Sequence, residues 1–343
     1  MQALQRIAYL LERAGAPTYR VRAFRGAAAT LAALDPADVA ARAATGRLRD
    51  LPGVGSTTEA VAVEALAGGV PSYLAKLEEE AGDVAAEAAV VLTGAGAELR
   101  AALRGDCHTH SDWSDGGSPI EEMARAAMAL GHEYIVLTDH SPRLKVANGL
   151  TAERLRTQLD LVAAVNETLA PFRILTGIEV DILDDGSLDQ TDELLDRLDV
   201  VVASVHSKLR MDAALMTPRM VAAVRNPHVD ILGHCTGRLV TGRGRPQSEF
   251  DAEAVFAACA ESDTAVEVNC RPERLDPPRR LLRLAVGAGC KVSIDTDAHA
   301  PGQLEWQPFG CARAAECGVG VDSVVNTWPA DLLLAWASSH QAG

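Results

Sequence analysis

The 343-residue sequence lacks any apolar run of the ~18–20 residues that a membrane-spanning helix requires. It also lacks a basic segment followed by an apolar core at its beginning, because the chain starts directly in an amphipathic pattern. These absences predict a cytoplasmic protein with no membrane partner. The apolar fraction of 48% is sufficient to bury a core, and the length suits one large domain plus a small one.

The seven cysteines form no C-x-x-C pair, and their number is odd. A disulfide framework and a thiolate zinc site both require paired cysteines at short spacing. The sequence therefore predicts buried, reduced thiols.

An excess of positive charge is also missing, because the net charge is −15. This value opposes a surface that is adapted to nucleic acid over the whole molecule. The charge is uneven, however: residues 1–55 carry eight arginines and only four acidic residues. Such asymmetry points to a basic N-terminal region beside an acidic remainder.

Residues 1–80 have the pattern of short helices, with a Pro52-Gly53-Val54-Gly55 turn between two of them. Such a turn resembles a helix-hairpin-helix, in which glycines let backbone N–H groups approach a phosphate without reading sequence. The alternative is that these glycines only make a tight connection between helices. The predicted DNA-backbone contacts are Arg20, Arg22, Arg25, Gly53 and Gly55.

After a linker, strand and helix patterns alternate along the rest of the chain, which predicts a domain of α/β type. The predicted boundaries are residues 1–80 for a small all-α domain, 81–103 for a linker, and 104–343 for the main domain. Seven short apolar runs read as buried strands with polar residues at their carboxyl ends. We therefore predict a distorted, TIM-like barrel of seven parallel strands whose site lies at that face.

Metal-type ligands end most of these runs. Side chains two apart share one strand face, so His108 and His110 form one pair and Asp297 and His299 another. Any one buried histidine is ordinarily a core residue, but six of the nine histidines follow the same pattern; His132, His228 and His340 are expected at the surface. Imidazole and carboxylate without a cysteine cluster suit Mn, Zn or Fe. The predicted ligands are His108, His110, Asp115, His140, Glu179, His206, His234, Asp297 and His299.

These segments resemble the motif series of the PHP (polymerase and histidinol phosphatase) family: Gly-Asp-Cys-His108-Thr-His110, Leu-Thr-Asp-His140, Gly-Ile-Glu179-Val-Asp, Ser-Val-His206, Leu-Gly-His234 and Thr-Asp297-Ala-His299. Together with the basic N-terminal segment, they are similar to bacterial family X DNA polymerases. The palm and fingers of such polymerases have no counterpart between the two matching parts, so DNA synthesis is not expected.

The resemblance implies three divalent ions. The first would be held by His108, His110, Glu179 and Asp297, the second by Glu179, His206 and His234, and the third by Asp115, His140 and His299. It also implies that Glu179, Asp297 and His299 serve catalysis, and that Arg238 and Arg274 grip the phosphate. Paired ions of this kind activate water for phosphate-ester hydrolysis.

Three functions are compatible with this sequence. A DNA-processing 3′–5′ exonuclease or phosphodiesterase is favoured, because a small-molecule enzyme has no need of the basic N-terminal region. The acidic barrel and the missing palm favour instead a phosphatase acting on a small phosphomonoester such as histidinol phosphate. The third is a non-catalytic DNA-binding accessory protein with a structural metal site, and the complete ligand set weighs against it.

Overall fold

The computed structural model describes residues 1–341, apart from the side chains of residues 82–91. Its contacts separate two compact units: one is Met1–Val90 with Ala300–Gln303, and the other contains the remainder of the chain. None of the helices described is long and apolar enough to cross a membrane. All seven cysteines are free and buried, as predicted.

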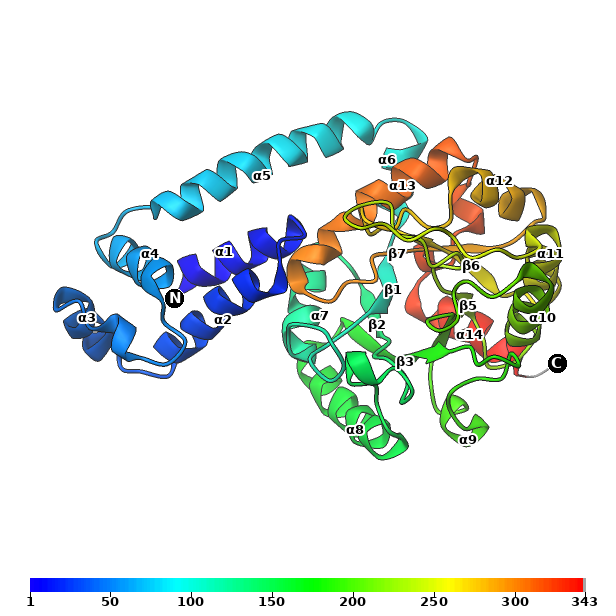
Figure 1. The fold of residues 1–343 in the computed structure, drawn as a ribbon, viewed down its shortest axis with the longest axis horizontal. Coiled ribbons are helices and arrows are strands. Elements are labelled where there is room, and N and C mark those ends of the chain that lie inside the picture. Colours follow the sequence, from blue (N-terminus) through cyan, green and yellow to red (C-terminus); the bar gives the residue numbers. More distant parts are fainter. Residues whose placement is uncertain (342–343) are drawn as a thin grey trace. The chain divides into compact units, whose positions relative to one another are not determined.

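The first unit is helical (Figure 1) and comprises α1 (Gln2–Arg13), α2 (Thr18–Ala32), α3 (Pro36–Ala44), α4 (Ser56–Leu66) and most of α5 (Ser72–Val91). Helix α1 buries Leu4, Ile7 and Leu11 on one face, because residues three and four apart lie on the same side of a helix. These side chains pack with Phe24 of α2 and with α4 in one apolar cluster.

A tight turn precedes α4 and docks on α2. Gly53 has a φ of +78°, which glycine adopts readily. A Cβ added there would lie 3.7 Å from the carbonyl carbon of Gly26, and Thr30 Oγ1 donates to the carbonyl oxygen of Pro52 at 2.9 Å. The hairpin turn is therefore held against the middle of α2.

The second unit is a barrel of seven parallel strands in sequential order, as predicted. The strands are β1 (Gly105–Thr109), β2 (Tyr134–Leu137), β3 (Arg173–Asp181), β4 (Val200–Ser204), β5 (Ile231–Leu232), β6 (Ala265–Asn269) and β7 (Val292–Asp295). An isolated bridge between Thr109 and Ala298 joins the two outer strands, so the barrel is nearly closed.

Helices surround the strands in Figure 1 and supply the outer layer of the barrel. They are α6 (Ala95–Ala102), α7 (Ile120–Ala129), α8 (Ala152–Leu169), α9 (Asp192–Leu195), α10 (Ala213–Val224), α11 (Ala252–Glu261), α12 (Arg279–Gly287), α13 (Gln307–Glu316) and α14 (Ala330–His340). Alternate residues of β4 belong to different clusters: Val201 packs with α10 and α11, whereas Val202 packs with Trp336 of α14. This division is typical of parallel strands that are buried on both faces.

Candidate metal centre

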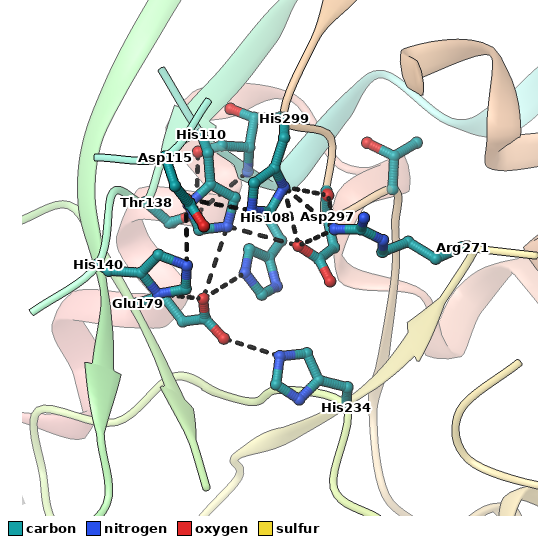
Figure 2. Close-up of polar contacts among 12 residues, drawn as sticks. His108, His110, Asp115, Thr138, His140, Glu179, His234, Arg271, Asp297 and His299 are labelled. Atoms are coloured by element: carbon teal, nitrogen blue, oxygen red, sulfur yellow. Dashed lines mark hydrogen bonds and ion pairs between the residues drawn. The ribbon is translucent and has the colours of Figure 1, made fainter. Parts of the chain in front are cut away.

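The nine predicted ligands meet at the carboxyl ends of the strands. Figure 2 shows His108, His110, His140 and His234 converging on the carboxylate of Glu179, at the end of β3. Glu179 Oε2 lies 3.3 Å from His108 Nε2, 3.5 Å from His110 Nε2 and 2.9 Å from His140 Nδ1. Its other oxygen lies 3.1 Å from His206 Nε2 and 2.8 Å from His234 Nε2. One buried carboxylate thus contacts five histidines that lie at the ends of four strands, β1, β2, β4 and β5.

The remaining ligands surround His299. Asp115 Oδ1 lies 3.3 Å from His299 Nε2 and 3.5 Å from His140 Nε2. Asp297 Oδ1 lies 3.5 Å from both His110 Nε2 and His299 Nδ1. The site therefore extends continuously from Asp115 at its rim to His234.

Three sets of these atoms lie close enough together to hold a cation. They are His110 with Asp115, His140 and His299; His108 with His110 and Glu179; and His140 with Glu179 and His206. They overlap with the division that the resemblance implies, although His110 and His140 each belong to two sets. The number of ions and their identity stay predictions.

The chemistry of the donor atoms fits divalent cations. His110 is fully buried, and neither of its ring nitrogens has a hydrogen-bond partner among the described residues; His108 Nε2 and Glu179 Oε2 are unpaired as well. Buried polar atoms without partners are costly, so such a cluster requires something to satisfy it. A cation held between His108, His110 and Glu179 would satisfy one nitrogen of each ring together with the Glu179 oxygen.

The charges of the site are also those of a cation site. Burial, together with the neighbouring rings of His299 and His140, holds the pKa of His110 well below its usual value, so one ring nitrogen keeps a lone pair for a cation. Burial opposes ionisation of Glu179, but His206, His108 and His140 lower its pKa well below the ordinary range. Asp297 is likewise buried, and Arg271 and Arg274 lower its pKa. Both carboxylates are therefore ionised.

Local backbone irregularities aim these side chains. The register of β1 with β2 shifts between Asp106 and Thr109, and such bulges re-aim side chains at barrel rims. The bulge contains His108. Asp297 has a φ of +52°, a conformation that costs a non-glycine residue about 1–3 kcal/mol and that occurs mainly at functional sites.

Two further carboxylates hold ligand histidines by the nitrogen that faces away from Glu179. Glu267 of β6 lies 2.6 Å from His108 Nδ1, and Asp181 of β3 lies 2.5 Å from His206 Nδ1. Histidine ligands commonly donate their second N–H to a carboxylate, which fixes the tautomer and the orientation of the ring. Neither Glu267 nor Asp181 was predicted from the sequence to contact a ligand. An ionisable residue inside the apolar run Ala265-Val-Glu-Val-Asn269 was the available signal for Glu267.

Buried Asp139 organises the loop that carries Asp115. Its carboxylate accepts hydrogen bonds from the backbone N–H of Ser111 at 2.8 Å, from Ser114 Oγ at 2.5 Å and from Gln158 Nε2 at 2.6 Å. Asp139 follows β2 and Gln158 lies in α8, so the loop after β1 is fixed by its neighbours. This network too was missed from the sequence.

The predicted phosphate-gripping arginines have different surroundings. Arg274 Nε lies 3.2 Å from Asp297 Oδ2, inside the site. Arg238 instead donates through its guanidinium to the carbonyl oxygens of Arg274 and Leu275, so it fixes the loop that carries Arg274. Arg271 was not among the favoured residues, but its Nη1 lies 3.2 Å from His299 Nδ1 and 3.4 Å from Asp297 Oδ1.

The predicted DNA contacts lie in the helical unit, around the turn that contains Gly53 and Gly55. Arg25 is paired with Glu12 at 2.6 Å, and Arg20 donates to the hydroxyl of Tyr73 at 2.5 Å. Arg22 is exposed and lies one helical turn before Gly26, on the face of α2 that contacts the hairpin. Of the three arginines, Arg22 is the one most open to a ligand.

The three histidines expected at the surface are not surface residues. His132 is 5% exposed, and the His340 side chain is also 5% exposed and lies 2.8 Å from Asp230. His228 is 11% exposed beside Asp196. The prediction was wrong for His340 because α14 packs on the barrel strands, a contact that no local pattern reveals. His132 lies near Arg100 and Arg104, and His228 lies near Asp192 and Asp196, so these two are also covered by residues from other segments.

The sequence matches the PHP domain over residues 106–271 and a helix-hairpin-helix domain over residues 1–71. It is 42% identical over 224 residues to the DNA polymerase/3'-5' exonuclease PolX of Bacillus subtilis, covering 65% of this chain and 39% of that protein. The chain thus spans about two fifths of the polymerase. A probable phosphatase of Acetivibrio thermocellus is 34% identical over 203 residues, which cover 57% of this chain and 78% of the relative.

Among solved structures, the histidinol phosphate phosphatase of Lactococcus lactis, complexed with zinc, L-histidinol and phosphate, gives a TM-score of 0.46 at 18% identity. The match covers 63% of this chain and 94% of the phosphatase.

Proposed function

This chain belongs to the PHP domain family of phosphate-ester hydrolases, and we propose that it acts on DNA as a metal-dependent 3′–5′ exonuclease or phosphodiesterase. The observation that carries the proposal is the presence in one chain of the clustered ligands and of a helix-hairpin-helix unit. A hydrolase of small phosphate esters requires only the first. The relative that is named a polymerase and 3'-5' exonuclease also has the higher identity of the two reported above.

We place up to three divalent ions, Mn, Zn or Fe, among the nine ligands. When bound, such ions activate the attacking water and neutralise charge on the phosphate. The residues of the chain prepare the site for them. Glu267 and Asp181 hold the rings of His108 and His206 so that each Nε2 faces Glu179. Neutral His110 offers the lone pair of one ring nitrogen without adding positive charge.

Arg271 and Arg274 orient the phosphate in this proposal. Both guanidinium groups contact Asp297, and Arg274 Nη1 has no hydrogen-bond partner among the described residues. An arginine binds phosphate oxygens in a fixed, planar geometry. The loop that carries both residues is rigid, because Arg238 and Arg313 donate to its carbonyl oxygens. Arg238 therefore contributes by positioning Arg274.

The helical unit would bind DNA through the phosphates of the DNA backbone. The N–H groups at the start of α4 follow the Gly53–Gly55 turn, and exposed Arg22 lies on the adjoining face of α2. Contacts of this kind bind phosphates without reading sequence. The small number of free arginines predicts weak, salt-sensitive retention of DNA.

The alternative is a phosphatase for a small phosphomonoester. The coverage supports it, because the chain spans 78% of the probable phosphatase but 39% of the polymerase. In that case the helical unit would serve another purpose.

The deciding experiment compares two substrates with Mn²⁺ added. A 5′-labelled oligonucleotide and histidinol phosphate are incubated with the wild-type chain, with Asp297→Asn, and with Arg22→Glu. Stepwise shortening of the oligonucleotide that Asp297→Asn abolishes and Arg22→Glu weakens supports the proposal. Phosphate release from histidinol phosphate with the oligonucleotide left intact would make the phosphatase correct instead.

A further inference from the structure

The segment between β5 and α11 contains a small hairpin that the proposed chemistry does not use. The backbones of Leu239 and Arg245 exchange hydrogen bonds of 2.9 and 2.8 Å. The tip is Gly242-Arg243-Gly244, and both glycines have positive φ. We name Leu239–Arg245 the β5 hairpin.

The β5 hairpin lies in a strongly basic stretch of an acidic protein. Residues 238–246 contain three arginines and no acidic residue, although the net charge of the chain is −15. Arg238 and Arg245 donate to backbone carbonyl oxygens, which leaves them structural roles. Arg243 is exposed, and it has no ion pair or hydrogen bond among the residues that the structure describes. A free cation therefore stands at the tip.

The β5 hairpin is attached to the rim of the metal centre. It follows β5 directly after His234, at the end of the barrel where the ligands lie. Val240 N donates to the carbonyl oxygen of Glu273 at 2.7 Å, within the loop that carries Arg271 and Arg274. The hairpin that carries Arg243 is thus bonded directly to the loop that carries the two arginines in contact with Asp297.

We propose that the β5 hairpin binds the phosphodiester backbone of a single-stranded nucleic acid next to the bond that is cleaved, with Arg243 contacting a neighbouring phosphate. A phosphomonoester has one phosphate, which the ligands and Arg271 and Arg274 already serve. A polynucleotide has further phosphates, and an exposed cation at the tip of a hairpin beside the centre can bind one of them. The inference rests on the proposed function and makes Arg243 a determinant of preference for a chain over a small ester.

The test uses the full chain and the variants Arg243→Ala, Arg243→Lys and Arg197→Ala. Arg197 is an exposed arginine that precedes β4, at the opposite end of the barrel, and serves as the matched control. The readout is kcat/KM for a single-stranded 12-mer divided by kcat/KM for a dinucleotide. Loss of one solvent-exposed ionic contact costs about 0.2–1 kcal/mol, so Arg243→Ala should lower this ratio about two- to fivefold. Arg243→Lys should restore part of it, and Arg197→Ala should leave it unchanged.

Salt dependence gives a second readout. Each phosphate contact on a single strand contributes about 0.7 to the slope of log affinity against log salt, so Arg243→Ala should reduce that slope by about this amount. An unchanged ratio, or an equal loss on both substrates, overturns the inference.

Binding of a fluorescent oligonucleotide separates failure of the inference from failure of the proposed function. If the wild type binds the oligonucleotide without cutting it, the exonuclease proposal fails, and weaker binding by Arg243→Ala still supports the hairpin. If the wild type binds no oligonucleotide, or if Arg243→Ala binds it as tightly as the wild type does, the inference is wrong.

Discussion

The carboxylate of Glu267 offers a sharp test of how the metal centre is held. Glu267 accepts from two sides: His108 Nδ1 lies at 2.6 Å and the backbone N–H of His234 at 2.5 Å. Glutamine has the same shape but a single accepting oxygen. We predict that Glu267→Gln lowers the affinity for divalent ions 10–100-fold, the range typical for partners of ligand histidines.

Each orientation of the glutamine has a definite consequence. If its oxygen faces His108, the N–H of His234 loses its acceptor, which costs about 1–3 kcal/mol for a buried donor. If its oxygen faces His234, its amide donates to His108 Nδ1, and the ring proton moves to Nε2. That nitrogen, 3.3 Å from Glu179, then has no lone pair for a cation. The first orientation reduces stability and the second reduces metal binding.

Calorimetric titration of metal-free protein with Mn²⁺ or Zn²⁺ measures the affinity, and metal analysis after dialysis gives the ions bound per chain. The melting temperature is recorded separately. Asp230→Asn is the matched control, because Asp230 is also buried in the barrel but accepts from Val201 and His340 instead. The control should lose stability and keep its metal affinity. If Glu267→Gln binds metal as tightly as the wild type, Glu267 does not position His108 and the reasoning fails.

Three further outcomes are expected. Burial, aided by Arg100, lowers the pKa of His132 to about 4. As the pH falls below ~6.5, the unfolded chain therefore binds a proton at His132 before the folded chain does. The free energy of unfolding should fall by up to about 3 kcal/mol between pH ~6.5 and pH 4. His132→Gln should flatten this slope in urea titrations at several pH values, and an unchanged slope would contradict it. His340→Ala removes a donor 2.8 Å from buried Asp230 and should lower the free energy of unfolding, measured in urea, by about 1–3 kcal/mol. Ser338→Ala, on the exposed side of α14, is the control, and an equal loss of stability in both variants would contradict a specific role for His340. Chelation with EDTA should abolish hydrolysis and lower the melting temperature, with both restored by Mn²⁺, because ions that bind the folded state stabilise it; activity that persists in EDTA would exclude metal dependence.

The strands and their ligands could be predicted together, because the apolar run that predicts a strand and the polar residue that predicts a ligand are adjacent in the sequence. A buried parallel strand is a short apolar run, and in this barrel several of the runs end in histidine or a carboxylate. Local sequence is enough to recognise Val200–His206 or Lys291–His299. The convergence of the ends then follows from the barrel.

Partners that are distant in sequence could not be predicted. Glu267 and His108 are 159 residues apart, and the sequence around Glu267 does not show which histidine its carboxylate contacts. Arg238 and Arg274 are both arginines in loops that follow barrel strands, yet Arg238 donates to backbone carbonyl oxygens and Arg274 contacts Asp297. Their roles depend on the path of the loop after β6, which is set by tertiary contacts. The burial of His340 likewise depends on where α14 packs.

The charges around Asp297 connect the ions to the substrate. Arg271 and Arg274 contact this carboxylate, and His110 Nε2 lies 3.5 Å from it on another side. If Asp297 held a divalent ion, the ion would weaken the attraction between this carboxylate and the two guanidinium groups and would repel them. A phosphate oxygen would be attracted to the ion and to both arginines, and it would offset this repulsion. Phosphate and ions should therefore bind with positive coupling, each raising the affinity of the other by the same factor. The two arginines would therefore make the charge balance of the ion-bound centre depend on a bound phosphate.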